Sequence, residues 1–405
     1  MGQLVEKAAE AALASEHSLS EDILNARILV VDDSRTMRLT ITRFLARCGF
    51  NDLVEAEDGI EALEILQSQT PELVITDLLM PRLDGLGLCR AIRANPLLRS
   101  VPVLVQTGTV SNEGRGQAFA EGATDLISKP LNLREMLGRV RVHIEQRLLT
   151  RKLQSFQEKM QLELELARTM QYSLLPDAER LQNIVGAFPI ELGHFYEPSY
   201  GLGGDLWDIR SLNASMLSIF LIDFSGHGVS SALNTFSFRS MMQSIVPGGK
   251  EIPELLSLLN DKLCKSLQTG QFATFLIARI DFVQSRIQLG SAAGPPPMLR
   301  VGPDGPFTPL QSDGLPLGLV SEATYTVSEH PFPPGSMLLF YSDALIETPL
   351  APHSVFDDVE LARALTLKAR CTSPQSVVDE LVNALAPHER EDDLTLVALQ
   401  HRISR

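Results

Sequence analysis

Short apolar runs alternate with amphipathic helical stretches from residue 26 to about residue 140, and this alternation restricts the fold more than any other feature. Helical patterns such as TMRLTITRFLARCGF and GIEALEILQ lie between the runs ARILVV, DLVEA, ELVIT, PVLVQ and TDLISK. Strands that are separated by crossing helices lie parallel in one sheet. We therefore expect a doubly wound α/β domain of flavodoxin-like type with a five-stranded parallel sheet.

Polar residues stand at the carboxyl ends of these predicted strands, where ligands bind in such sheets. Asp32 and Asp33 close the first strand, and Asp77 closes the third. Three carboxylates in one crevice would repel each other without a cation, and an oxygen-rich site of this kind suits Mg²⁺. Thr107 ends the fourth strand with a hydroxyl, and Lys129 ends the fifth with a positive charge for a phosphoryl oxygen.

This pattern resembles the receiver domain of response regulators over about residues 26 to 145. The resemblance implies that Asp77 accepts a phosphoryl group from a histidine kinase or a small phosphodonor, and that Thr107 and Lys129 contact that group. The family usually has an aromatic residue three positions before the lysine, where this chain has Leu126. The implied Mg²⁺ ligands are Asp33, Asp77 and the backbone carbonyl of Leu79, with Asp32 acting through water.

A long helix is expected next, because the segment from Leu131 to Leu174 has no proline and one glycine, Gly138. Apolar residues then recur at 4-3 spacing, which is typical of a coiled-coil seam that Glu163 interrupts. About 35 helical residues would span roughly 50 Å. The pattern predicts a signalling helix and a homodimer contact, with packing on its own domain as the alternative. The seam residues are Leu149, Leu153, Phe156, Met160, Ala167, Met170 and Leu174.

After residue 190, runs of strands and runs of helices follow each other without strict alternation, which predicts an antiparallel α+β domain. Four acids stand at the ends of its elements: Asp205, Asp223, Asp343 and Asp392. A site made of carboxylates suits hard divalent cations. Two such cations can activate a shared water for the hydrolysis of a phosphate ester, so the protein need not supply a nucleophile.

The segments ARTMQYSLLP, GGDLWD, DFSGHGVSSAL, GLPLG, LFYSDALIE and DDLTLV resemble, in this order, PPM-type (protein phosphatase 2C-like) serine/threonine phosphatases of the SpoIIE and RsbU branch. The resemblance covers about residues 165 to 402 and implies an antiparallel β-sandwich flanked by helices. It also implies two Mn²⁺ or Mg²⁺ ions that Asp223 bridges. The other implied ligands are Asp205 and the backbone carbonyl of Phe224 for one ion, and Asp343 and Asp392 for the other.

Two positions depart from this family's pattern without removing a ligand. The chain has SAAGPPP where NAGHPP is frequent, and Ala344 where a glycine often follows the ligand Asp343. We interpret Asp208 and Asp393, which neighbour the acids, as structural or supporting residues. His227 is a candidate proton donor, although packing in its loop is the alternative that we favour. Small residues are expected to allow close backbone approach: Gly203, Gly204, Ser225, Gly226 and Gly228.

Composition excludes several classes of function. The net charge of −15 argues against nucleic-acid binding, and no apolar stretch has the length of a membrane span. The four cysteines are scattered without metal-ligand spacing and are expected to be reduced, so we expect a cytoplasmic protein. The predicted parts are an N-terminal tail (1–25), a receiver domain (26–140), a helical coiled-coil linker (141–176) and a phosphatase domain (177–405).

Two functions from different classes fit these features. The first is a response regulator whose phosphorylation at Asp77 controls a metal-dependent protein serine/threonine phosphatase. By resemblance, its substrate would be an anti-sigma-factor antagonist of the STAS type in a partner-switching pathway. The alternative is a non-catalytic adaptor that binds a sigma factor or another regulator through a phosphatase-like domain. An adaptor should lack several of the four acids, and this chain keeps all of them.

Overall fold

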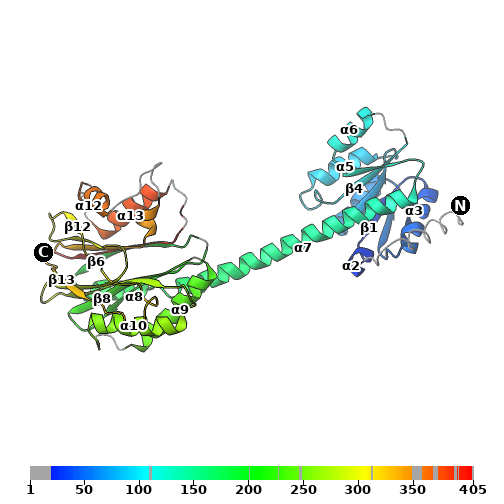
Figure 1. Cartoon of the computed structure of the whole chain (residues 1–405). Helices are drawn as coiled ribbons and strands as arrows, with labels where there is room; N and C mark the ends of the chain where they lie inside the picture. Colours follow the sequence, from blue (N-terminus) through cyan, green and yellow to red (C-terminus); the bar gives the residue numbers. More distant parts are fainter. Residues whose placement is uncertain are drawn as a thin grey trace. The chain divides into compact units, whose positions relative to one another are not determined.

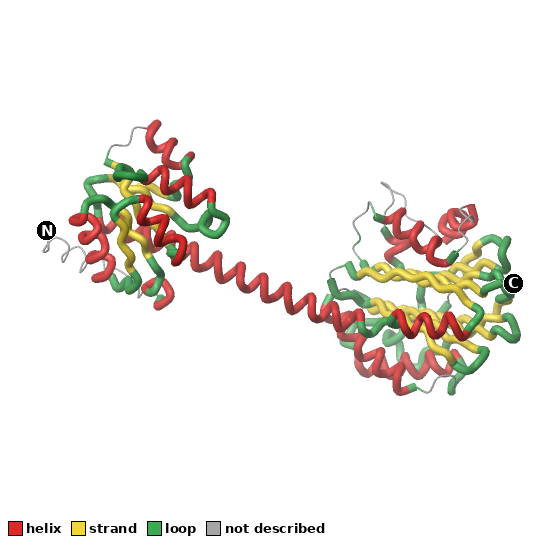
Figure 2. The backbone as a smooth tube through the Cα atoms, turned by 180° about the vertical axis from the view of Figure 1, so that it is seen from behind, coloured by secondary structure: helices red, strands yellow, loops and turns green. Residues whose placement is uncertain are grey.

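The computed structural model describes residues 20–403, except for 109–111, 200, 227, 246–248, 312, 349–357, 368–372, 387–389 and 391. The chain divides into two compact units, Met1–Met160 and Gln161–Arg405. Both can be followed in Figure 1 and Figure 2. No helix along the described ranges combines the length and the apolar character that crossing a membrane requires.

The first unit contains a five-stranded sheet in which neighbouring strands are parallel, in the order β2-β1-β3-β4-β5. This confirms the predicted doubly wound sheet. Its strands are β1 (Ile28–Val31), β2 (Leu53–Ala56), β3 (Leu73–Asp77), β4 (Val103–Thr107) and β5 (Asp125–Ser128). The shorter helices are α2 (Glu21–Leu24), α3 (Arg35–Arg47), α4 (Gly59–Ser68), α5 (Gly85–Ala94) and α6 (Asn112–Ala120).

The sheet of the first unit is apolar on both faces, because helices cover both of them. On β1, Val30 packs in a cluster with Phe44 of α3, whereas Val31 packs on the other face in a cluster with Leu88 of α5. All four residues of β1 are buried. Every side chain of β1 is apolar, so the first polar side chain is that of Asp32, which follows the carboxyl end of the strand.

Helix α7 (Leu133–Tyr172) has 40 residues and is described along its whole length. Its first part packs into the first unit through Met136, Val140 and Ile144. The helix ends before Leu174, which lies in the next segment and packs against the core of the second unit. The predicted seam is otherwise exposed at its large apolar positions, from 42% at Met160 to 61% at Leu149 and Phe156, with Leu153 at 58% and Met170 at 54%. Packing of these five side chains on their own domain is therefore not observed.

The second unit is a sandwich of two five-stranded antiparallel sheets, with strand orders β13-β10-β9-β8-β7 and β12-β11-β14-β15-β6. This confirms the antiparallel α+β prediction. The first sheet contains β7 (Asp205–Ser211), β8 (Met216–Phe224), β9 (Ala273–Asp281), β10 (Arg286–Ala292) and β13 (Val327–Pro331). The second contains β6 (Ile190–Glu197), β11 (Met298–Arg300), β12 (Phe307–Pro309), β14 (Met337–Tyr341) and β15 (Leu394–His401).

Helices cover the outer faces of this sandwich, as Figure 2 shows. They are α9 (Val229–Ser244), α10 (Ile252–Ser266), α11 (Ala344–Glu347), α12 (Asp358–Leu367) and α13 (Pro374–Leu385). Helix α8 (Ala178–Ala187) instead packs through Leu181 and Ile184 into the layer between the two sheets. Strand β8 illustrates the layering, because Leu221 packs between the sheets while Phe220 packs with Phe238 of α9. The alternation of side chains along a strand sends neighbours to opposite layers.

Asp208 on β7 fastens α8 and α9 to the first sheet of the sandwich. Its side chain is fully buried and forms ion pairs with Arg180 at 2.9 Å, with Arg210 at 2.8 Å and with Arg239. A buried carboxylate needs such partners, because removing a charge from water without compensation is costly. These contacts agree with the structural role that we predicted for Asp208. These ion pairs use both carboxylate oxygens of Asp208. Because side chains alternate along a strand, these ion pairs lie on the opposite face of the sheet from Asp205.

Candidate functional site

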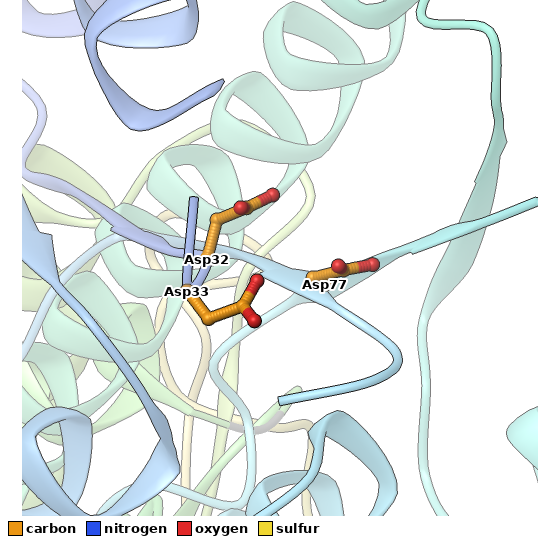
Figure 3. A group of neighbouring side chains, drawn as sticks. All are labelled: Asp32, Asp33 and Asp77. Atoms are coloured by element: carbon orange, nitrogen blue, oxygen red, sulfur yellow. The ribbon is translucent and has the colours of Figure 1, made fainter. Parts of the chain in front are cut away.

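The first unit gathers three carboxylates at the carboxyl end of its sheet, as Figure 3 shows. Because β1 lies between β2 and β3, Asp32 and Asp33 after β1 stand beside Asp77 at the end of β3. One oxygen from each lies within 4.8 Å of the other two. Ser34 donates its backbone N–H to Asp32 Oδ1 at 2.8 Å, while Asp32 Oδ2 is buried without a hydrogen-bond partner among the described residues.

The charges around this group fit a divalent cation. Burial raises the pKa of Asp32, and repulsion by Asp77 raises it further. Lys129 places its Nζ 2.7 Å from Asp77 Oδ1 and 4.0 Å from Asp32 Oδ2, so one cationic side chain already compensates part of the charge. A cluster with an unpartnered buried oxygen and excess negative charge is the environment that Mg²⁺ favours.

The other predicted residues of this site lie around the same edge. Thr107 ends β4 and is 7% exposed, and its carbonyl accepts a 2.7 Å hydrogen bond from the backbone N–H of Lys129. Leu79 lies two residues after Asp77 on an exposed loop, with its side chain 76% exposed. Leu126, which takes the place of the aromatic residue, is buried at 7% exposure on β5. The structure thus places the predicted site residues at the carboxyl end of the sheet, whereas Leu126 lies within β5 opposite Val105 of β4.

In the second unit, strand pairing brings two acids together. Asp205 begins β7 and lies directly opposite Asp223 near the end of β8. Thr395 on β15 donates its hydroxyl to Asp205 Oδ2 at 2.5 Å, which connects the two sheets at this point. Asp343 follows β14, and Asp392 precedes β15. The two strands are paired, and at this end the backbone N–H of Ser342 donates to the carbonyl oxygen of Thr395 at 3.0 Å.

Three of these acids, Asp205, Asp223 and Asp343, are destabilised as carboxylates in the absence of a cation. Burial raises the pKa of Asp205 well above its ordinary value, with repulsion by Asp223 next in importance. Burial likewise raises the pKa of Asp223, and Asp343 adds to it. The pKa of Asp343 is raised to about 6 by burial and by the neighbouring Asp392. Asp205 Oδ1 and Asp343 Oδ1 are buried without hydrogen-bond partners among the described residues, so the donor set fits hard cations.

The two acidic groups differ in how tightly they are gathered. At Asp32, Asp33 and Asp77, one carboxylate oxygen from each residue lies within 4.8 Å of the other two. No other set of three acids among the described residues is as close, so no three described acids of the second unit bring their oxygens this close together.

The loop before Asp205 is held by tight packing and by Asp393. The side chain of Asp393 accepts backbone hydrogen bonds from Ser199 at 2.8 Å and from Gly204 at 2.6 Å. A Cβ atom on Gly203 would lie 2.2 Å from Asp393 Oδ2, and one on Gly204 would lie 2.6 Å from the carbonyl oxygen of Phe224. Both positions therefore exclude any side chain. This agrees with the predicted supporting role of Asp393 and with close backbone approach at these two glycines.

Comparisons with known proteins agree with this division of the chain. Residues 28–141 match the family model "Response regulator receiver domain". Residues 214–402 match the family model "Stage II sporulation protein E (SpoIIE)". The chain carries a receiver domain and a SpoIIE-type PP2C phosphatase domain. The resemblances on which the sequence predictions rest are thereby confirmed for both domains.

Individual relatives cover parts of the chain. Response regulator MprA of Mycobacterium ulcerans is 42% identical over 119 residues, which are 29% of this chain and 50% of that protein. The chain thus spans about half the length of the curated relatives it matches. The SiaA-PP2C domain of Pseudomonas aeruginosa has a similar fold, with a TM-score of 0.53 and 20% identity over 60% of this chain and 98% of that one.

Sequence reasoning missed Gln171, in the last turn of α7. Gln171 is 2% exposed and binds the backbone of Gly203 twice. Its amide nitrogen donates to Gly203 O at 2.5 Å, and Gly203 N–H donates to its Oε1 at 3.0 Å. The end of the helix is thereby joined to the loop that leads into Asp205. A glutamine among the exposed polar residues of a long helix gives no sequence signal for such a contact.

Tyr196 on β6 was also missed. Its ring meets the ring of Tyr172, the last residue of α7, edge to face at a centroid distance of 5.3 Å. Its hydroxyl is buried without a partner among the described residues, and burial followed by the charge of Asp205 raises its pKa strongly. Trp207 packs in the core between the sheets, with 1% exposure. His227 lies outside the described residues.

We expect the metal-free protein to lose stability as the pH rises from about 4 through about 6. The pKa of Asp343 is about 6 in the folded chain against an ordinary value of 3.8, so the folded state binds this proton more tightly than the unfolded state. The stabilisation that this proton gives to the folded state is complete below about pH 4 and is lost as Asp343 ionises near pH 6. Urea unfolding in chelator across this range measures the change, and Mg²⁺ or Mn²⁺ at pH 7 should restore stability.

Asp343→Asn is the matched variant for this experiment, because it removes the titrating group and keeps its shape. Its stability should fall less across the same pH range than that of the unaltered protein. Identical pH profiles for the two proteins would contradict the prediction, since they would show that Asp343 does not contribute to the loss.

Proposed function

We propose that this protein is a response regulator whose output is a metal-dependent protein-serine/threonine phosphatase controlled by phosphorylation of Asp77. The observation that carries the proposal is the convergence of buried and half-buried acids at the ends of paired strands in the phosphatase domain, two of which have a buried oxygen without a hydrogen-bond partner among the described residues. Asp205 and Asp223 face each other across β7 and β8, and Asp343 has a buried oxygen without a partner in the described chain. Such carboxylates are stable when cations offset their charge.

In this proposal, Asp223 would be a ligand shared by two Mn²⁺ or Mg²⁺ ions. Asp205 and the backbone carbonyl of Phe224 would help to hold one ion, and Asp343 and Asp392 would help to hold the other. When bound, the ions supply an activated water and neutralise charge on the phosphate ester. The work of the chain itself is positioning. The hydroxyl of Thr395 orients the carboxylate of Asp205 through the 2.5 Å hydrogen bond.

The loop that carries Asp205 is positioned from two sides. Asp393 accepts the backbone N–H of Gly204, the residue immediately before Asp205, and Gln171 binds both backbone groups of Gly203. These bonds fix the backbone without using any proposed metal ligand. Small displacements of this loop would therefore move Asp205 relative to Asp223, which gives the end of α7 direct influence over the site.

In the receiver, Asp77 is the proposed phosphoryl acceptor, with a histidine kinase as the donor partner. Mg²⁺ would be held by Asp33, Asp77 and the backbone carbonyl of Leu79, and by Asp32 through water. Lys129 is already 2.7 Å from Asp77 and would contact the phosphoryl group together with the hydroxyl of Thr107. Phosphorylation adds about −1.5 to −2 charge at this point, which is enough to change the position of Lys129 and the loop around it.

Helix α7 is the proposed route between the two domains, because its one continuous segment begins in the receiver and carries Gln171 in its last turn. The proposed domain limits of 26–140 and 177–405 leave residues 141–176 as the linker. Exposed apolar side chains at 4-3 spacing favour a parallel helix from a second copy as its partner. A phosphorylation switch must bias two arrangements that differ by a few kcal/mol, and a paired helix can supply them.

The proposed substrate is a phosphoserine- or phosphothreonine-bearing protein. An anti-sigma-factor antagonist of the STAS type, acting in a partner-switching pathway, is proposed from the resemblance to the SpoIIE and RsbU branch. A cytoplasmic location without a nucleic-acid or membrane partner is part of the same proposal. The adaptor function is the second candidate, but retention of the four acids gives it no support.

Asp223→Asn should lower phosphatase turnover by at least about a thousandfold while the fold is kept, because the variant loses the proposed bridging carboxylate. The assay follows release of phosphate from a phosphoserine-bearing STAS protein with Mn²⁺ or Mg²⁺, and circular dichroism checks the fold. Asp304→Asn, at an exposed loop position, is the matched control and should retain activity. Undiminished turnover in Asp223→Asn would disprove this site. No metal-dependent release by the unaltered protein, with or without a phosphoryl mimic, would disprove the enzyme.

Beryllofluoride or acetyl phosphate should change the phosphatase rate, and Asp77→Asn should remove that response. The variant cannot accept a phosphoryl group but keeps the size of the side chain. The measurement compares initial rates with and without the phosphodonor for both proteins, with Glu64→Gln on α4 as a control that should still respond. A response that persists in Asp77→Asn would contradict control through this residue.

Light scattering should give about twice the mass of one chain in at least one phosphorylation state. Leu153→Lys should shift the protein toward the monomer, because it places a charge in the proposed helix pair. Lys152→Glu, at the neighbouring position outside the predicted seam, is the control for a charge change on this helix. Monomers in both states of the unaltered protein would remove the dimer from the proposal.

A further inference from the structure

The receiver contains a cavity at the end of the sheet opposite to Asp77. It has a volume of about 300 Å³ and lies between α7, the end of α5 and the loops that enter β4 and β5. Residues 99–102 precede β4, and Thr124 precedes β5. Because all strands of this sheet are parallel, their entering ends lie away from the carboxyl ends that carry the acidic group. The cavity is therefore separate from the proposed phosphorylation site.

Four arginines line this cavity, which we call the arginine pocket: Arg93, Arg99, Arg147 and Arg151. No carboxylate is among the lining residues that the structure describes. Glu72, behind the lining, pairs with Arg147 at 3.1 Å and also with Arg151. The one acid thus serves two arginines, and the pocket keeps a surplus of positive charge in a chain whose net charge is −15.

Two of the guanidinium groups are held rigidly. Arg93 donates from Nη1 to the carbonyls of Arg99 at 3.0 Å and Val101 at 2.7 Å, and from Nη2 to the hydroxyl of Thr124 at 3.0 Å. Arg147 donates from Nη1 to the carbonyl of Ser100 at 2.7 Å and to its hydroxyl at 2.9 Å. Guanidinium groups fixed in this way can face a ligand without further loss of side-chain entropy.

The third, Arg99, is available for a ligand. Its side chain is exposed, and its guanidinium makes no hydrogen bond or ion pair with any residue of the described ranges. Burial lowers the pKa of Arg93, and the charge of Arg147 lowers it further. Crowding of like charges in a partly buried space is unfavourable unless an anion offsets it. Planar guanidinium groups match the oxygens of phosphate, and several donors can bind it together.

We propose that the arginine pocket binds a small oxyanion of the phosphate class, through Arg93, Arg99 and Arg147. The bound anion would connect the loop before β4 to helix α7, because Arg99 lies on the loop and Arg147 on the helix. This site goes beyond the proposed phosphatase function, which involves neither the pocket nor its ligand. The competing interpretation is that these arginines serve only to hold the backbone carbonyls of the loop.

A calorimetric titration tests the proposal. Inorganic phosphate is added to the full-length protein in the presence of a chelator and at constant ionic strength. Without divalent ions the two acidic groups repel phosphate, so they do not compete for it. We expect one phosphate to bind per chain in a saturable manner. The same titration with chloride should show no such binding. Absence of saturable binding, or equal binding of chloride, would overturn the proposal.

Three variants identify the site. Arg99→Gln should weaken phosphate binding at least about tenfold, because it removes a charged donor and no contact within the fold. Thr150→Glu should abolish binding, since it places a carboxylate at a lining position on α7. Arg43→Gln, at an exposed position on α3 outside the lining, removes the same charge and should bind as the unaltered protein does. Equal weakening in Arg43→Gln and Arg99→Gln, or unchanged binding in Thr150→Glu, would show that phosphate does not occupy this pocket.

Discussion

Repulsion between buried carboxylates at the ends of paired strands is the constraint on which both domains depend. In the receiver, the parallel order places the ends of β1 and β3 side by side, so Asp32 and Asp77 must share one space. In the phosphatase domain, antiparallel register sets Asp205 opposite Asp223. The apolar strands that carry these acids are buried and cannot move apart to relieve the repulsion. Charge must therefore be offset locally, by Lys129 in one domain and by divalent cations in the proposed function of both.

Around the phosphatase acids, backbone hydrogen bonds fix the geometry while the acids remain available as ligands. Asp393 and Gln171 both bind the Gly203–Gly204 backbone, and neither uses the carboxylate of Asp205. Asp208, three positions after Asp205 on β7, is instead neutralised by three arginines. The same residue type thus has three roles within β7 and its neighbours, and the partners of each side chain decide which role it has.

Much of the fold could be predicted because local patterns determine it. Apolar runs such as ILVV in β1 are buried on every residue, and their length and flanking acids define a strand without tertiary information. The acids Asp32, Asp77 and Asp223 could be predicted as candidate site residues because they stand at the ends of such runs, and Asp205 because it stands at the start of one. Gln171 and Tyr196 could not, because their partners at Gly203 and Tyr172 lie far away in the sequence and form no repeating pattern.

The sequence by itself determined the strands of the receiver sheet, the positions of the acids and the presence of a long helix, because burial and helical periodicity are properties of neighbouring residues. Tertiary structure alone decided which acids are paired and which remain without partners, since ion pairs such as that between Asp208 and Arg239 join separate elements. It also decided that Arg93 and Arg147, 54 positions apart in the numbering, face one cavity. A cavity exists only when separate segments fold around it, so no local pattern could have indicated the arginine pocket.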